Sequence, residues 1–93
     1  MKGNYLNEFI DDLYHNPEKE ISYRGAKYMI RGYFSPSANV YTLEVCTIEI
    51  SPHTLFSHTS SERRDCVESF VNAKIFNGMS LYEVEKDIEV LYG

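Results

Sequence analysis

The fold class is predicted mainly from residues 21–50, ISYRGAKYMIRGYFSPSANVYTLEVCTIEI. Its first part predicts a β-hairpin over residues 21–34, because Gly25 supplies the positive φ of a tight turn and aromatic and β-branched residues fill both arms. Residues 35–39 have the composition of a second turn. Residues 40–50 are rich in β-branched side chains and form the strongest predicted strand. We therefore expect a three-stranded antiparallel sheet.

A first helix is predicted ahead of this sheet. Apolar residues recur at helical spacing over residues 4–15, with Asn4 as the N-cap, and Pro17 stops the segment. After the sheet, residues 51–60 are polar and contain Pro52, which is typical of a loop. This loop would connect the last predicted strand to the helices that follow it.

Two capping-box patterns predict helices in the C-terminal third. TSSE at residues 59–62 opens a predicted helix that runs to about residue 75 and ends before Asn77-Gly78. SLYE at residues 80–83 opens a predicted final helix. The expected fold is α+β in the order α-β-β-β-α-α, with the helices packed on one face of the sheet.

The length and composition fit a single domain over residues 1–93. The chain is 43% apolar and 25% charged, as in ordinary globular proteins. The longest uninterrupted apolar run is three residues, so we expect no membrane association. The opening residues, MKGN, lead into a charged amphipathic stretch, and the chain has two cysteines. We therefore expect no secretory signal and a cytoplasmic, reducing environment.

The net charge of −5 is concentrated near the two ends of the chain. Residues 1–20 and residues 80–93 each carry −3, whereas residues 21–79 carry +1. On helices these acids would form strips that repel nucleic acid and favour a basic groove of a protein partner. The alternative is that they are ordinary solvated helix faces. The candidate partner-binding residues are Glu8, Asp11, Asp12, Glu83, Asp87 and Glu89.

Four of the five cysteine and histidine residues fall within residues 46–66. Zinc prefers four thiolate or imidazole ligands, and a small domain gains much stability from such a site. The spacing C-x6-H-x4-H-x7-C lacks the close cysteine pair of standard zinc fingers, and Glu62 or Asp65 could replace one ligand. The alternative is two packed cysteines and two exposed loop histidines. The candidate ligands of one structural zinc ion are Cys46, His53, His58 and Cys66.

Patterns typical of catalysis are weak. The glycines are isolated, so the sequence has no phosphate-binding loop. Cys66 follows two arginines, but it lies on the apolar face of the predicted helix, which favours a packed and inert thiol. We expect no enzymatic activity.

The predicted sheet also carries tyrosines beside basic residues, a combination that can stack single-stranded bases. The acidic composition and the lack of an RNP-type motif argue against this use. We expect no direct nucleic-acid binding and half-buried sheet tyrosines instead. The tyrosines in question are Tyr23, Tyr28, Tyr33 and Tyr41.

Two segments carry a resemblance to known proteins. Residues 66–85, CVESFVNAKIFNGMSLYEVE, resemble a tail pattern of short uncharacterised proteins of Firmicutes and their mobile elements. Residues 21–28, ISYRGAKY, are similar to the N-terminal part of those proteins. The matched positions are caps, glycines and core residues, so the resemblance implies a fold and a genetic setting. Small acidic proteins from this setting include the anti-CRISPR proteins, which inhibit type II CRISPR nucleases.

The resemblance and the charge layout lead to one hypothesis of function. We expect a small non-enzymatic inhibitor, an anti-CRISPR protein in the cytoplasm of a bacterial host. It would dock its acidic surface into the basic nucleic-acid channel of a type II CRISPR nuclease, with or without guide RNA. The alternative is a structural or regulatory accessory protein of a mobile element that binds another protein partner.

Overall fold

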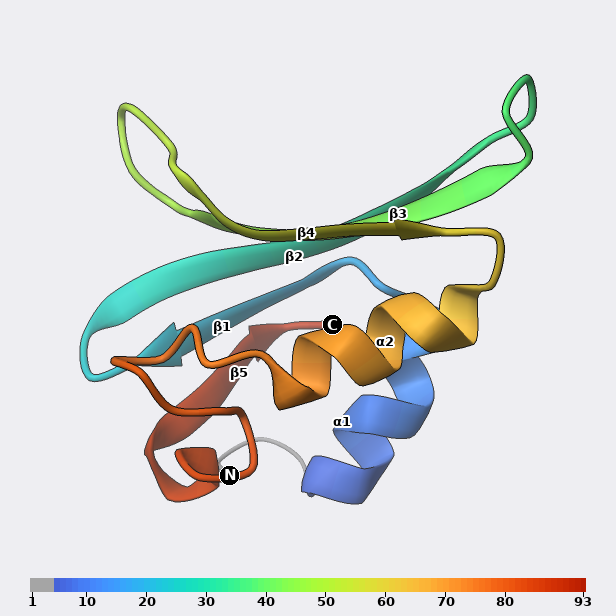
Figure 1. The fold of residues 1–93 in the computed structure, drawn as a ribbon. Helices are drawn as coiled ribbons and strands as arrows, with labels where there is room; N and C mark the ends of the chain where they lie inside the picture. The colour runs from blue at the N-terminus through green and yellow to red at the C-terminus, as the bar shows by residue number, and fades with distance from the viewer. Residues whose placement is uncertain (1–4) are drawn as a thin grey trace.

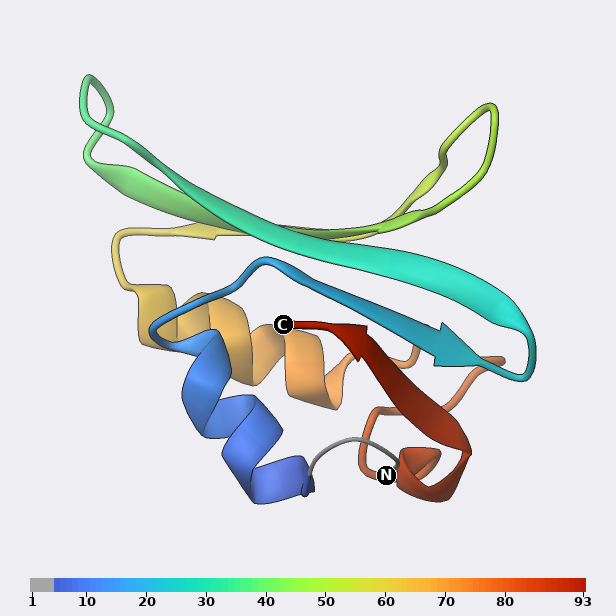
Figure 2. The same ribbon diagram turned by 180° about the vertical axis from the view of Figure 1, so that it is seen from behind.

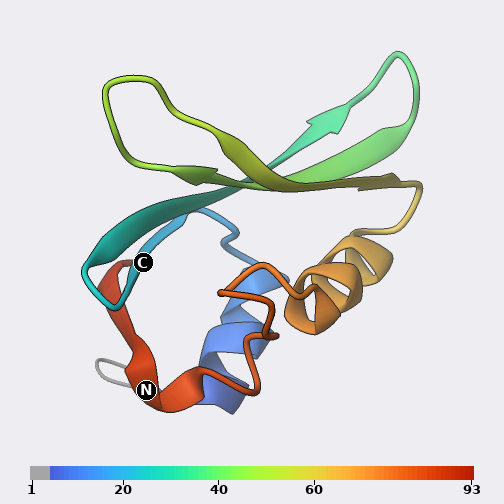
Figure 3. The same ribbon diagram turned by 60° about the vertical axis from the view of Figure 1, so that its left-hand side comes forward.

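The computed structural model describes residues 5–93. A five-stranded antiparallel sheet, in the spatial order β4-β3-β2-β1-β5, carries two helices on one face (Figures 1 and 3). The predicted α+β class is confirmed, whereas the three-stranded sheet and the order α-β-β-β-α-α are wrong. The elements are α1 (Leu6–Leu13), β1 (Lys19–Tyr23), β2 (Ala26–Ser35), β3 (Val40–Thr47), β4 (Thr54–Ser60), α2 (Arg63–Asn72), the 3-10 helix η1 (Glu85–Asp87) and β5 (Ile88–Tyr92).

The predicted hairpin at the centre of the sheet is confirmed. Arg24 and Gly25 both have positive φ angles, 49° and 85°, as the two central residues of a type I′ turn require. Strands β1 and β2 pair on either side of this turn, from Tyr23 opposite Ala26 to Lys19 opposite Ile30. Strand β1 therefore starts two residues earlier than the predicted hairpin.

The predicted loop over residues 51–60 is wrong, because most of it forms β4 on the edge of the sheet. Strand β3 ends at Thr47, and the chain turns back so that β4 pairs with β3 from Thr54 to Ser60. On β4 only Phe56 packs against the core, and the other side chains are polar or exposed. A polar edge strand lacks the apolar alternation by which strands are recognised in a sequence.

The predicted final helix is wrong as well. The Ser80–Glu83 capping box forms its two hydrogen bonds: the Ser80 amide donates to Glu83 Oε1 at 3.0 Å, and the Glu83 amide donates to Ser80 Oγ at 3.4 Å. The chain then passes through η1 into β5, where Ile88 and Val90 face the core. Strand β5 pairs with β1, whose outer edge would otherwise be unpaired.

The two helices are shorter than predicted. Helix α1 covers eight residues within the predicted 4–15, and the expected N-cap Asn4 lies outside the described residues. Helix α2 begins at Arg63, because Thr59 belongs to β4, where its hydroxyl hydrogen-bonds that of Thr42 at 2.8 Å. Asn77 and Gly78, expected to end this helix, form a separate tight turn with positive φ. No helix in residues 5–93 is long and apolar enough to cross a membrane.

One continuous core lies between the sheet and the helices. Its largest fully buried side chains include Phe9 from α1, Phe70 from α2 and Phe76 from the segment after α2. Phe76 contacts the ring edges of Tyr23 and Tyr28, with centroids 5.6 and 5.8 Å apart. This packing occupies one face of the sheet and leaves the other face uncovered.

Candidate functional site

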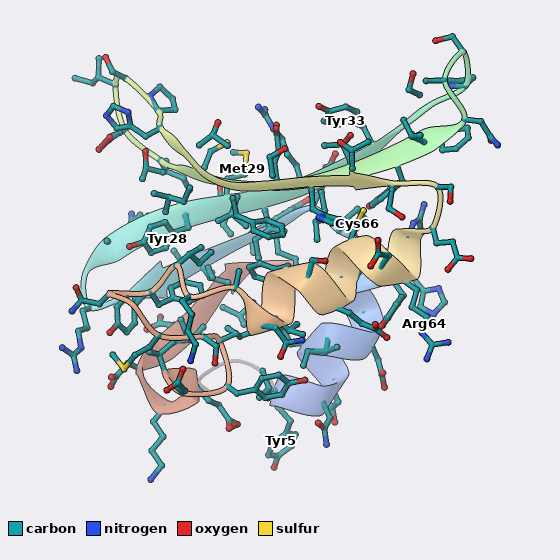
Figure 4. All side chains as sticks on the ribbon, viewed as in Figure 1. Tyr5, Tyr28, Met29, Tyr33, Arg64 and Cys66 are labelled. Atoms are coloured by element: carbon teal, nitrogen blue, oxygen red, sulfur yellow. The ribbon has the colours of Figure 1, made fainter. Side chains whose placement is uncertain are left out.

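The uncovered side of the sheet, which we call the open face, is the most distinctive surface of the molecule. Side chains alternate between the two faces along each strand. Figure 4 shows Met29 and Tyr33 on the open face, and Tyr28 and Cys66 on the helix side. The β2–β3 and β3–β4 hairpin ends both rise away from the helices, so the open face is concave along the strands (Figures 1 and 2).

The strand register brings a row of side chains together across the centre of the open face. Met29 lies opposite Cys46 on β3 and Glu20 on β1, and Glu20 lies opposite Tyr92 on β5. Two hollows flank Met29. The hollow of about 240 Å³ reaches Tyr92, and that of about 190 Å³ reaches Cys46 and Ile48. Both leave room beside Met29 for side chains of another molecule.

Acidic groups exceed basic groups on the open face. Among the outward-facing strand residues, three are acidic (Glu20, Glu44 and Glu89) and two are basic (Lys27 and Arg31). The Arg31 Nε donates to Glu44 Oε1 at 2.5 Å, which raises the pKa of Arg31 and pairs its charge locally. Besides this pair, the outward-facing strand residues comprise two acids, Glu20 and Glu89, and one basic residue, Lys27, so the acids remain in slight excess.

The β3–β4 hairpin places apolar side chains at the rim of the open face. Strand β3 ends at Thr47, the Ile48 amide still donates to the Lys27 carbonyl at 3.0 Å, and residues 49–51 then bend away before Pro52. Ile50 is fully exposed, and Ile48 and Leu55 are 38% and 39% exposed. Exposed apolar side chains that gather into one large patch can mark a contact with another protein.

The predicted acids of α1 have two different roles. Glu8 and Asp11 are exposed and make no ion pair with any residue in the range 5–93. Asp12 instead accepts a hydrogen bond at 2.5 Å from the Nζ of Lys19, whose side chain is completely buried. The same Nζ donates to the Gly93 carbonyl at 3.1 Å. Asp12 therefore forms an ion pair within the fold, although its side chain is 43% exposed.

The predicted acids near the C-terminus are also divided. Glu83 accepts from Lys74 Nζ at 2.6 Å and from the Ser80 amide, and these contacts lower the pKa of Glu83 to about 2. Asp87 pairs with Arg24 at 3.4 Å. Glu89 is exposed on the open face. The two predicted acidic strips therefore do not merge, because α1 and Glu89 lie on opposite faces of the sheet.

The four predicted zinc ligands are not brought together. Cys46 faces the open face and contacts Thr54, whereas Cys66 is buried in α2 on the other side of the sheet. His53 is exposed in the β3–β4 loop, and His58 faces α2. Within residues 5–93, no group of three or more histidine, cysteine or acidic side chains is placed to hold a metal ion.

The cysteine and histidine of the α2–β4 region do not form an activated nucleophile. His58 Nε2 lies 3.1 Å from Asp65 Oδ2, and this contact lowers the pKa of Asp65. The Cys66 thiol donates to the backbone carbonyls of Tyr41 and His58, both at 3.4 Å. Burial raises the pKa of Cys66, which keeps the thiol protonated at neutral pH. The geometry is that of a packed structural cysteine.

The tyrosines considered for base stacking are divided between the two faces of the sheet. Tyr23 and Tyr41 are buried in the core, and Tyr28 packs against it. Tyr33 lies on the open face and is 52% exposed. The four rings therefore do not form one stacking platform.

Met29, Ile50 and Tyr92, which lie at the centre and rim of the open face, are not among the site residues predicted from the sequence. The alternation of Tyr28 and Ile30 around Met29 was a signal that Met29 faces the other side of the sheet. The segment just before Pro52 was a signal that Ile50 lies in a turn. Tyr92 had no comparable signal, because its place depends on β5.

No protein-family model, no curated protein and no solved structure matches this chain. The expected relationship to the anti-CRISPR proteins therefore stays a prediction.

Proposed function

We propose that this protein is a non-enzymatic inhibitor that binds a partner protein through the open face of its sheet. The main supporting observation is the concave, uncovered face itself, with Met29 between two hollows at its centre. A half-buried methionine adapts its shape to different neighbours and is common at binding surfaces. Ile50, fully exposed at the rim, adds an apolar anchor of the kind that fills a partner's pocket.

The charge of the open face indicates a basic partner. Glu20 and Glu89 face outward beside the Met29 row, and the whole chain carries a net charge of −5. Acidic groups attract a basic surface and speed the encounter with it. A type II CRISPR nuclease is the first partner to test, because its nucleic-acid channel is lined with basic residues and the sequence resemblance implies the same class. Occupying that channel would block guide or target binding.

A DNA-cleavage assay tests this proposal. A type II CRISPR nuclease is mixed with the protein before or after addition of guide RNA, and cleavage of a matched target is measured. Met29→Arg places a bulky cation at the centre of the open face, and Asn72→Arg places the same charge on α2, on the other side of the sheet. We expect inhibition by the wild type and Asn72→Arg, and loss of inhibition in Met29→Arg.

The order of addition identifies the blocked step. Inhibition only before guide addition indicates that guide loading is blocked, whereas inhibition in both orders indicates blocked target binding or cleavage. If several type II nucleases are unaffected, the same two variants serve in a pull-down from bacterial lysate. A partner retained by Asn72→Arg and lost by Met29→Arg would support the accessory-protein alternative. A partner that binds both variants equally would refute binding through the open face.

A further inference from the structure

We infer that the element of the partner received by the open face is an amphipathic α-helix with basic residues beside its apolar stripe. This inference rests on the proposed function and adds the shape and chemistry of the bound element. The two raised hairpin ends lie at either end of β3, so the open face forms a trough over this strand, and the axis of the trough crosses it (Figures 1 and 2).

The dimensions of the trough suit one helix. Strand β3 runs between the two hairpin ends for eight residues, which corresponds to about 25 Å at about 3.3 Å per residue. A helix with its side chains is about 10–12 Å wide and fits between the ends.

The side chains along the trough match the stripe of such a helix. Tyr92, Glu20, Met29 and Cys46 lie in one row across β5, β1, β2 and β3; all but Glu20 are apolar or aromatic, and the two hollows lie along this row. Apolar side chains spaced three or four residues apart on a helix would enter the hollows on either side of Met29. The row therefore favours a regular apolar stripe.

The charges beside the row indicate which residues should flank the apolar stripe of the partner helix. Glu20 lies within the row, Glu18 lines the larger hollow, and Glu89 lies two residue pairs away along β1 and β5, across Ser22 from Lys27. These three carboxylates make no ion pair with residues 5–93. Lysine or arginine side chains flanking the apolar stripe would pair with them, whereas an acidic helix would be repelled.

A peptide titration tests the inference. The probe is a synthetic helical peptide of leucine and lysine, about 18 residues long, with leucine at helical spacing; the matched probe has glutamate in place of lysine. Amide and methionine-methyl NMR signals of the full chain are followed during titration. We expect the lysine peptide to shift the signals of Met29, Cys46 and Tyr92, and the glutamate peptide to shift none of them.

Variants establish where the peptide binds. Met29→Arg should raise the Kd of the lysine peptide by roughly tenfold or more, whereas Asn72→Arg should leave it within about twofold. Amide spectra show that each variant is folded. Shifts confined to α1 and α2, or equal Kd values for the two variants, would overturn the inference. A lysine peptide that fails to bind while Met29→Arg still abolishes nuclease inhibition would refute the helical partner and leave the proposed function intact.

Discussion

At the scale of single residues, Lys19 is the most unusual side chain of the core. Its amine is completely buried, contacts Asp12 and the Gly93 carbonyl, and lies 5.7 Å from the centroid of the Phe9 ring. A buried charge is tolerated only when it is paired and hydrogen-bonded. Lys19 thus connects α1, β1 and the end of β5 through one group.

Replacing Asp12 tests this role. Asp12→Asn leaves the ammonium of Lys19 without its counterion and should lower the free energy of unfolding by about 2 kcal/mol. This loss is smaller than for a fully buried ion pair, because the Asp12 side chain is 43% exposed. Adding Lys19→Met should recover much of the loss. Denaturant titration measures both. Asp11→Asn is the control, with an expected change within about 0.5 kcal/mol. Equal losses of unfolding free energy in Asp12→Asn and Asp11→Asn would show that Asp12 does not stabilise the buried Lys19.

Glu83 predicts a pH dependence of stability. Its contacts with Lys74 and Ser80 lower its pKa from an ordinary 4.5 to about 2, so the unfolded chain takes up the proton first as the pH falls. The stability contributed by Glu83 is complete above about pH 4.5 and is lost between there and about pH 2. Glu83→Gln should therefore have a lower Tm at pH 7, and the difference should shrink toward pH 2.

Melting curves at several pH values measure this difference. Glu85→Gln serves as the control, since Glu85 makes no ion pair with residues 5–93. A Tm difference for Glu83→Gln that stays constant from pH 7 to pH 2 would show that the carboxylate charge is not responsible.

At the scale of elements, Gly32 fixes how β2 packs against β3. A Cβ at this position would lie 1.9 Å from the Tyr41 hydroxyl oxygen and 2.6 Å from Tyr41 Cζ. The aromatic ring thus covers the glycine of the neighbouring strand, an arrangement that stabilises curved sheets. The Tyr41 hydroxyl is buried and has no hydrogen-bond partner within residues 5–93.

Gly32→Ala should displace the Tyr41 ring and lower the free energy of unfolding by about 1–3 kcal/mol. Tyr41→Phe alone should cost little, because the lost hydroxyl is unpaired. When Tyr41 is already replaced by phenylalanine, Gly32→Ala should lower the free energy of unfolding by less, because the Tyr41 hydroxyl that would lie closest to the new Cβ is absent. A double-mutant cycle by denaturant titration measures the coupling, and additive effects of the two changes would disprove the contact.

The two edge strands show why part of the fold could not be read from the sequence. Residues 81–91 have apolar residues at helical spacing, and Ser80 and Glu83 form a true capping box. Strand β5 forms there because the outer edge of β1 supplies backbone partners, which local pattern does not reveal. Strand β4 was also missed because it is polar. It lies at the edge of the sheet and packs only Phe56 against the core, so its sequence lacks the apolar alternation of a strand.

At the scale of the whole molecule, the acids of α1 and those of the open face lie on opposite sides of the sheet. At about 0.15 M ionic strength the Debye length is about 8 Å, so charges on the far side of the domain are screened. Reversing Glu8 and Asp11 to lysine should leave the Kd of the leucine–lysine peptide within about twofold. Reversing Glu20 and Glu89 should weaken binding by roughly tenfold.

Titration of both double variants decides which acidic surface binds. The two variants change the net charge equally, so they control for overall charge. A larger effect of Glu8 and Asp11 would favour the acidic helix surface expected from the sequence over the open face.

The α+β class, the central hairpin around Arg24-Gly25 and the first helix could be predicted from local sequence, because turn chemistry and periodicity act over a few neighbouring residues. The sequence also shows which acidic residues the chain has, but not which of them form ion pairs within the fold. Three features became visible only in the folded chain: Asp12 pairs with Lys19, Cys46 and Cys66 lie on opposite faces of the sheet, and β4 and β5 complete the sheet. These outcomes depend on contacts between distant segments, and the same contacts create the open face.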